Sequence, residues 1–146
     1  MPKSTTFAND LVGLIFNATS IASIARDAAV PLTNLCLSLH TGTPGIGGAQ
    51  TTNEVTTVAY PNYTRINVAR TAGGWTVGSG IATLTALAAF PQSGSGTGAT
   101  LTHVAIGTDL TGAGKVLYAG SLNANLNVAN LIQPQFQASS LTTTET

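Results

Sequence analysis

Apolar and polar residues alternate most clearly in the segment Leu35-Cys36-Leu37-Ser38-Leu39. A spacing of two places the three leucines on the same face of a β-strand. A turn rich in Thr, Gly and Pro follows at residues 41–45 and supplies the backbone angles that end a strand. We predict that this segment is the first buried strand and that the rest of the chain is organised around it.

The segment before this strand has the periodicity of a helix. Its apolar residues recur every three or four positions, which is typical of an amphipathic helix. They are Phe7, Leu11, Leu14, Ile15, Ala18, Ile21 or Ala22, and Ala25. A hydroxyl residue at positions 4–6 can cap a helix that starts near Phe7 and runs to about Asp27. The pattern favours a helix that covers its own β core, and the alternative is an arm that docks on a partner through Phe7 and Leu11.

The chain after residue 45 consists of short β-forming runs separated by Gly, Ser, Asn and Pro. The predicted strands are 63–70, 75–77, 81–90, 102–107, 115–121, 126–128, 132–136 and 141–143. Residues 81–90 also show a three-residue apolar spacing, but Thr83 and Thr85 interrupt it and Pro91 follows, so we favour a strand. Residues 51–60 fit either an extended loop or an edge strand.

This series of strands predicts a mainly β fold, an antiparallel sandwich of jelly-roll type with an N-terminal α-helix. The length of 146 residues predicts one domain. Within it, residues 1–30 would form the helix and its connection, and residues 31–146 the β-sandwich.

The composition changes this picture in one respect, because the chain is nearly uncharged. Five basic residues balance five acidic ones, and charged residues make up 7% of the sequence, against roughly a quarter in ordinary domains. Nucleic-acid affinity comes mainly from neutralised phosphates, so we expect no nucleic-acid partner. No run of apolar residues is long enough for a membrane span, so we expect no membrane partner. A neutral surface of hydroxyl and amide groups suits packing against other proteins, and we predict a subunit of an assembly.

The acidic residues do not suggest a catalytic pair, which general acid-base chemistry would need. They are Asp10, Asp27, Glu54, Asp109 and Glu145. Ser38 and His40 share a strand face, but no acid or nucleophile turn accompanies them. We therefore expect no enzyme activity and no cofactor.

Two other patterns resemble binding motifs. Cys36, His40 and His103 could meet as three zinc ligands, but structural zinc sites usually contain closely spaced ligand pairs. The run from Gly112 to Lys115 lacks the earlier Gly and the following Ser or Thr of a phosphate-binding loop, so we interpret residues 109–114 as a hairpin loop.

Arg65 and Arg70 stand near aromatic residues in otherwise neutral strands. Arginine beside tyrosine or tryptophan is typical of interface hot spots. The aromatic neighbours are Tyr60, Tyr63 and Trp75. The alternative for these arginines is an internal ion pair with Glu54 or Asp109. The candidate interface residues are Phe7, Leu11, Tyr63, Arg65, Arg70 and Trp75.

With these residues in view, the chain resembles a family of small virion proteins of tailed bacteriophages, labelled tail fibre or capsid decoration. The matching features are the helix followed by Ser38-Leu39-His40-Thr41 and Pro44-Gly45, then Thr52-Asn53-Glu54-Val55, Tyr63-Thr64-Arg65, Val68-Ala69-Arg70, Gly74-Trp75-Thr76-Val77, Phe90-Pro91, Thr102-His103-Val104-Ala105-Ile106-Gly107, Gly112-Ala113-Gly114 and Leu117-Tyr118. The resemblance implies a β-rich body, no catalysis and no cofactor.

Our leading hypothesis from the sequence is a capsid decoration or cement protein on the outer capsid surface, bound to the major capsid protein and to copies of itself. The alternative is a tail-associated fibre or receptor-binding component, in which Trp75, Tyr60 and Tyr63 would form a platform for a host surface glycan.

Overall fold

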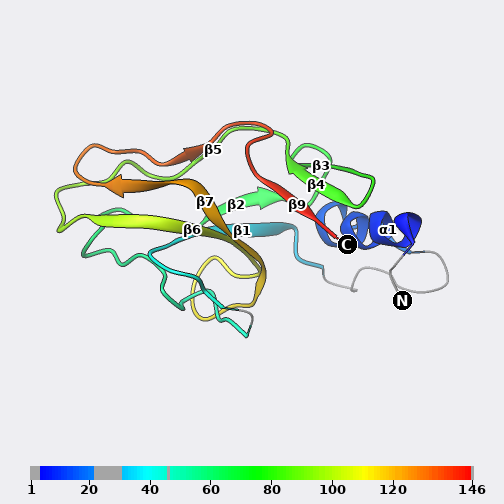
Figure 1. Ribbon diagram of the computed structural model, residues 1–146, viewed down its shortest axis with the longest axis horizontal. Coiled ribbons are helices and arrows are strands. Elements are labelled where there is room, and N and C mark those ends of the chain that lie inside the picture. Colours follow the sequence, from blue (N-terminus) through cyan, green and yellow to red (C-terminus); the bar gives the residue numbers. More distant parts are fainter. Residues whose placement is uncertain (1–3, 22–30, 46, 146) are drawn as a thin grey trace. The chain divides into compact units, whose positions relative to one another are not determined.

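The computed structural model describes residues 4–21, 31–45 and 47–145 (Figure 1). It contains one helix and nine strands in these residues. In chain order they are α1 (Thr5–Asn17), β1 (Asn34–His40), β2 (Ile66–Ala69), β3 (Trp75–Gly78), β4 (Ile81–Leu84), β5 (Ala88–Ala89), β6 (Ala99–Gly107), β7 (Val116–Val128), β8 (Gln135–Phe136) and β9 (Thr142–Thr144).

The elements belong to two compact units. The first unit comprises Met1–Asn34, Val68–Ala88 and Phe136–Thr146, and the second comprises Leu35–Asn67 and Ala89–Gln135. Helix α1 packs against β3 and β4 within the first unit. The predicted division at residue 30 stays a prediction. That the two units fold as one domain, as the length suggests, stays a prediction.

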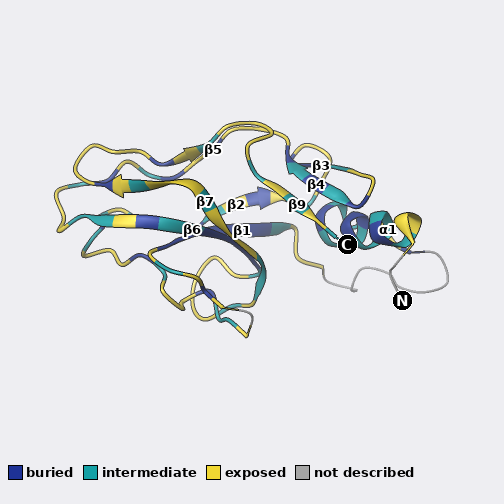
Figure 2. Cartoon of the chain, viewed as in Figure 1, coloured by how far each residue is buried: buried dark blue, intermediate teal, exposed yellow. Residues whose placement is uncertain are grey.

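The second unit contains β1, β6 and β7 of the sheet with the strand order β2-β1-β6-β7. Strand β2 and the separately paired short strands β5 and β8 each have residues in both units. Strand β1 pairs antiparallel with β6, and β6 pairs antiparallel with β7. Strand β1 is a central strand of the sheet, and the side chains on both of its faces are buried from Leu35 to His40 (Figure 2). The buried strand predicted from the alternating leucines is thus confirmed, and its other face carries Cys36, Ser38 and His40 into the interior.

The first unit places α1 against the three-stranded antiparallel sheet β3-β4-β9. Ser4 caps the helix, because its hydroxyl oxygen accepts a hydrogen bond of 3.2 Å from the Phe7 N–H. The fully buried Phe16 meets the fully buried Trp75 edge to face, with ring centroids 4.7 Å apart. The preferred prediction, a helix that covers its own β core, is confirmed.

The buried face of α1 differs from the apolar stripe predicted for it. The helix buries Ala8, Val12 and Phe16, which are spaced by four residues. Phe7 and Leu11, both members of the predicted stripe, are only half-buried. Apolar residues cover so much of the helix surface that either the face with Phe7 or the face with Phe16 could pack inward. The contact with Trp75 places the face with Phe16 in the core.

The helix is also shorter than predicted, since it ends at Asn17 rather than near Asp27. Ala18 adopts the left-handed conformation with φ 53°, and the Thr19 N–H donates to the Gly13 carbonyl. Residues 22–27 of the predicted helix lie outside the described residues. Among the described residues, no helix has the length and hydropathy needed to cross a membrane.

Arg70 holds the C-terminal end of this helix. Its guanidinium donates to the carbonyls of Leu14, Ile15 and Leu32, each at 2.7 Å. A cation at this end also complements the helix dipole. Arg70 therefore fixes α1 within the first unit by binding backbone carbonyls.

The mainly β fold with antiparallel sheets and an N-terminal helix is confirmed, whereas a jelly roll is not. Residues 81–90 form β4 and β5, as the strand interpretation predicts. The predicted strands 115–121 and 126–128 form one strand, β7, whose register against β6 shifts between them. The predicted strand 63–70 contracts to β2, and residues 51–60 form turns with a single bridge, His40↔Glu54.

The packing of α1 gives a first prediction. Phe16→Ala removes the ring that contacts Trp75 and should lower the free energy of unfolding by about 3–4 kcal/mol. Phe7→Ala, on the half-buried face, should cost about 1 kcal/mol or less. Trp75 is the only tryptophan, so its emission during urea unfolding reports on the first unit directly. Equal losses for the two variants would contradict the observed helix face.

Candidate functional site

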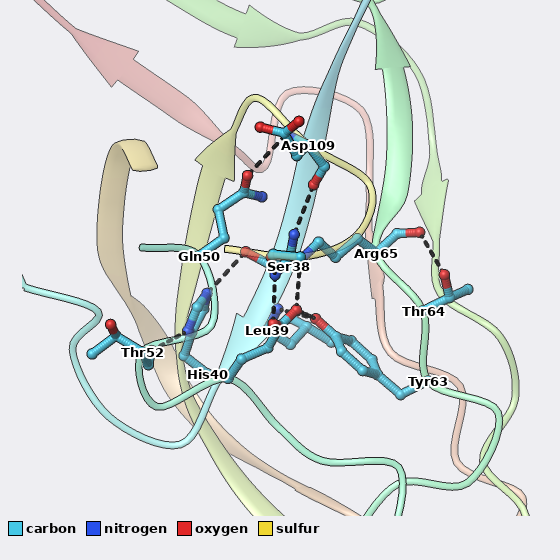
Figure 3. Close-up of polar contacts among 11 residues, drawn as sticks. Ser38, Leu39, His40, Gln50, Thr52, Tyr63, Thr64, Arg65 and Asp109 are labelled. Atoms are coloured by element: carbon cyan, nitrogen blue, oxygen red, sulfur yellow. Dashed lines mark hydrogen bonds and ion pairs between the residues drawn. The ribbon is translucent and has the colours of Figure 1, made fainter. Parts of the chain in front are cut away.

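A buried ion pair lies at the centre of the polar residues of the second unit (Figure 3). Arg65, only 4% exposed, binds Glu54 in a bidentate manner, with Nε to Oε1 and Nη2 to Oε2 both 2.7 Å. The Tyr63 hydroxyl donates to the same Oε1 at 2.8 Å and accepts from the Leu39 N–H at 3.0 Å. The ion pair is thereby tied to β1 through Tyr63.

The remaining donors of Arg65 hold the loop between β6 and β7. Nη1 donates to the Asp109 carbonyl and Nη2 to the Gly112 carbonyl, each at 2.8 Å. The hairpin loop predicted at residues 109–114 is confirmed. Of the two alternatives for Arg65, the internal ion pair with Glu54 is present, while Asp109 contributes its backbone oxygen.

Hydrogen bonding and burial raise the pKa values of Arg65, Tyr63 and the nearby Tyr60. The hydrogen bonds to Glu54 raise the pKa of Arg65 above its usual range. Burial raises the pKa of the Tyr63 hydroxyl far above its usual value, and burial raises that of Tyr60 to about 12. Both hydroxyls therefore remain protonated donors near neutral pH.

An open depression of about 280 Å³ lies over the ion pair. Glu54, Tyr63 and Arg65 contribute to it, together with the loop residues Leu110–Gly112. The rest of its wall comes from Thr51, Val55, Thr57 and Thr64. Because Arg65 and Glu54 already bind each other, the depression offers a partner mainly apolar atoms together with neutral hydroxyl groups.

Gln50 anchors the other side of the same loop. Its side chain is fully buried, its Oε1 accepts from the Asp109 N–H at 2.9 Å, and its backbone N–H donates to the Ala113 carbonyl. A Cβ at Gly107 or at Gly114 would collide with the Gln50 side chain. The role of Gln50 was not predicted from the sequence, because only the close approach of Gly107 and Gly114 to its side chain reveals its position.

Ser38 and His40 do meet, but in an arrangement unlike a catalytic triad. Ser38 Oγ and His40 Nε2 are 2.9 Å apart, and His40 Nδ1 is 2.9 Å from the Thr52 carbonyl oxygen. A carbonyl can only accept, so Nδ1 carries the proton and Nε2 accepts from the Ser38 hydroxyl. Both side chains are fully buried, and a backbone carbonyl stands where a triad has a carboxylate.

The zinc hypothesis finds no ligand set in the described residues, which contain no group of three or more His, Cys, Asp or Glu side chains placed for a metal. His40 and His103 are opposed in the β1–β6 register, but Thr102 Oγ1 lies 2.8 Å from His103 Nδ1. Cys36 Sγ donates to Asn67 Oδ1 at 3.2 Å, and burial raises the pKa of its thiol.

The predicted aromatic platform for a glycan is not available on the surface of this chain. Trp75 and Tyr60 are fully buried, and Tyr63 packs parallel to Phe90 with a centroid distance of 6.2 Å. Trp75 also belongs to the first unit and the two tyrosines to the second. The Tyr60 hydroxyl donates to the Pro91 carbonyl. These rings build cores, which the sequence could not distinguish from exposed stacking surfaces.

The placement of the candidate interface residues divides them into two groups. Arg65 and Trp75 are buried, whereas Phe7, Leu11, Tyr63 and Arg70 are partly accessible. The direct interactions of both arginines are with groups of this chain. A role of the partly accessible residues at an interface stays a prediction.

Comparison with known families adds what the geometry alone does not give. A family model described as podophage GP4 fiber I protein gp80 matches residues 2–144. The chain belongs to this gp80 family. It is therefore a structural protein associated with phage virions, as the sequence resemblance implied, and the family description names a fibre. No curated protein matches this gp80 family member.

The ion pair gives a second prediction. Glu54→Gln leaves the buried Arg65 without its counter-charge and should lower the free energy of unfolding by about 3 kcal/mol, measured by urea denaturation followed by circular dichroism. Hydrogen exchange at residues 108–115 should accelerate as well, because Arg65 holds their carbonyls. Asp10→Asn on α1 is the control and should change stability by less than about 0.5 kcal/mol. An unchanged exchange rate in the Glu54 variant would contradict the anchoring role.

The buried histidine gives a third prediction, on pH. Burial lowers the pKa of His40 below the ordinary 6.5, and Arg65 and His103 lower it further, against the raising effects of the Thr52 carbonyl and Glu54. The unfolded chain therefore takes up this proton more readily than the folded chain. The contribution of neutral His40 to the free energy of unfolding is complete above about pH 6.5. It is lost as the pH falls toward the pKa that His40 has in the folded chain.

We expect the wild-type free energy of unfolding to fall between pH 7 and 5 by up to about 1 kcal/mol per pH unit. His40→Gln should remove most of this slope, while His103→Gln should retain most of it, because His103 has the smallest influence among the groups that shift the pKa of His40. A slope that persists unchanged in His40→Gln would assign the effect to another group.

Proposed function

We propose that this protein is a non-enzymatic structural subunit of a fibre on a podophage particle and works by adhesion to other polypeptides. The single observation that carries the proposal is the family match over residues 2–144, whose description names a fibre. The sequence alone placed capsid decoration first and the tail fibre second, and the family description reverses that order.

The distribution of charge supports a role in protein contacts. Among the described residues, the basic side chains are Arg65, Arg70 and Lys115. The two arginines bind carboxylate and carbonyl oxygens of the chain itself, which leaves Lys115 as the exposed basic side chain in this part of the molecule. A surface of this kind offers neutral hydroxyl and amide groups, which suit interfaces better than phosphate binding.

The partners we propose are copies of this chain and neighbouring fibre or tail proteins. The major capsid protein is the partner under the second candidate, decoration of the outer capsid, which the sequence resemblance also includes. Neither candidate requires a cofactor or a catalytic residue. Host recognition, if the fibre performs it, would have to use groups other than the enclosed Trp75 and Tyr60 rings.

The location on the particle provides the fourth prediction. Antibodies against the purified chain, detected by gold labelling of intact particles, should decorate the fibres or tail and leave the capsid faces unlabelled. Densitometry of purified particles should give a copy number that is a small multiple of three or six, as tail symmetry requires. Particles made without the gene are the control. Even labelling of the shell, with hundreds of copies per particle, would establish capsid decoration instead.

A further inference from the structure

The edge of the second unit's sheet is a long strand with one free side. Strand β7 is last in the order β2-β1-β6-β7, so β6 pairs with one side of it and no strand lies beside the other in the described part of the chain. It has 13 residues, which lie along the nine residues of β6, so its paired length at strand geometry is about 30 Å. On the free side, the Val116 N–H at its start donates to the Gly48 carbonyl.

Natural sheets usually protect such an edge with charged residues, proline or a short strand, since its backbone groups can pair with another chain. Strand β7 has neither a charged residue nor a proline from Val116 to Val128. Most of its side chains are exposed or half-exposed, and it is drawn mainly in yellow and teal in Figure 2. Neither charge repulsion nor a missing N–H would oppose the addition of a second strand.

The sequence of β7 is also self-complementary about its midpoint. The segment Leu122-Asn123-Ala124-Asn125-Leu126 reads the same in both directions. When two copies run antiparallel about Ala124, Leu122 of one copy faces Leu126 of the other, and Asn123 faces Asn125. An interface with twofold symmetry needs this property, because the same surface must match itself. Cross-strand leucine and asparagine pairs are favourable on a shared face.

The pairing of β7 with β6 is interrupted at this same segment, residues 122–126. The register changes from Leu101↔Leu126 to His103↔Ser121, so residues 122–125 have no paired residues on β6. A bulge usually weakens an edge because it interrupts the regular row of backbone groups. Here the extra residues are on β7, where 122–125 stand opposite the single β6 residue Thr102, so the palindrome itself bulges out of the pairing with β6, and pairing with a second copy would be centred on it.

We propose that two copies of this chain associate through β7, with the strands antiparallel about a twofold axis at Ala124. The occupant of the edge is thus a second copy, as the palindrome indicates. The inference goes beyond the proposed fibre role and does not depend on the location of the protein on the particle, because it concerns the isolated chain in solution.

Cysteine cross-linking of the full chain tests the register, in the fifth prediction. Ala124→Cys places two thiols directly opposite each other across the axis, with Cβ atoms about 5 Å apart. Ala119→Cys is the matched control, because both alanines are exposed on β7 and two copies of residue 119 would lie roughly 33 Å apart. Mild oxidation should yield at least about tenfold more disulfide-linked dimer from Ala124→Cys. The native Cys36 is buried and remains in both variants. Equal cross-linking of the two variants would overturn the proposal.

Sedimentation equilibrium provides a second readout that does not require a disulfide. The wild-type chain should form dimers, and Ala124→Lys should weaken the dimer at least about tenfold, because two ammonium groups would then oppose each other. Val58→Lys, at a 70% exposed loop position, should leave the dimer intact. Circular dichroism should show the same folded signal for both variants. A wild-type monomer at about 100 μM, or a dimer that Ala124→Lys leaves unchanged, would overturn the proposal.

Discussion

The structure of the second unit depends on one buried guanidinium. Arg65 makes four hydrogen bonds of 2.7–2.8 Å, two to Glu54 and two to carbonyls of the β6–β7 loop. A buried charge is costly unless it is paired and hydrogen-bonded, and these acceptors meet that requirement. The same contacts fix the geometry of the turns, because residues 52–55 and 109–112 must both lie within reach of one planar group. In a chain with few charges, this pair specifies where two loops go.

Arg70 also connects separate segments, in the first unit, through hydrogen bonds to backbone carbonyls. It binds the carbonyls of Leu14, Ile15 and Leu32, with helix carbonyls taking the place of a carboxylate as its acceptors. A planar group with five donors can satisfy several acceptors at fixed angles, which a lysine cannot do. In the sequence both arginines resembled interface hot spots. In the structure their hydrogen bonds connect separate segments of the chain itself. The predicted alternative of an ion pair with Glu54 is confirmed for Arg65, whereas Arg70 binds backbone carbonyls that lie far away in sequence.

The sequence predicted most where local patterns decide the outcome. The alternating leucines predicted β1, hydroxyl residues at 4–6 predicted the helix cap, and glycines predicted the hairpin loop. It could not decide among long-range alternatives. The stripe with Phe7 and the face with Phe16 both suit a helix, and only the position of Trp75 selects between them. Gln50 is a polar residue in a turn-rich segment, and only its approach to Gly107 and Gly114 shows that it is buried. The Ser38–His40 contact could be anticipated from strand spacing, whereas its Thr52 acceptor could not.

The internal use of charge also bears on how such a protein would adhere. Attraction between exposed charges is screened at physiological ionic strength over about 8 Å and varies with salt. Contacts made by backbone groups, hydroxyls and apolar side chains do not depend on that screening. A strand such as β7, with neutral side chains and a free edge in the described residues, offers mainly these salt-independent interactions. A chain with few charged residues, whose Arg65 and Glu54 already bind each other, would keep such contacts as the ionic strength changes.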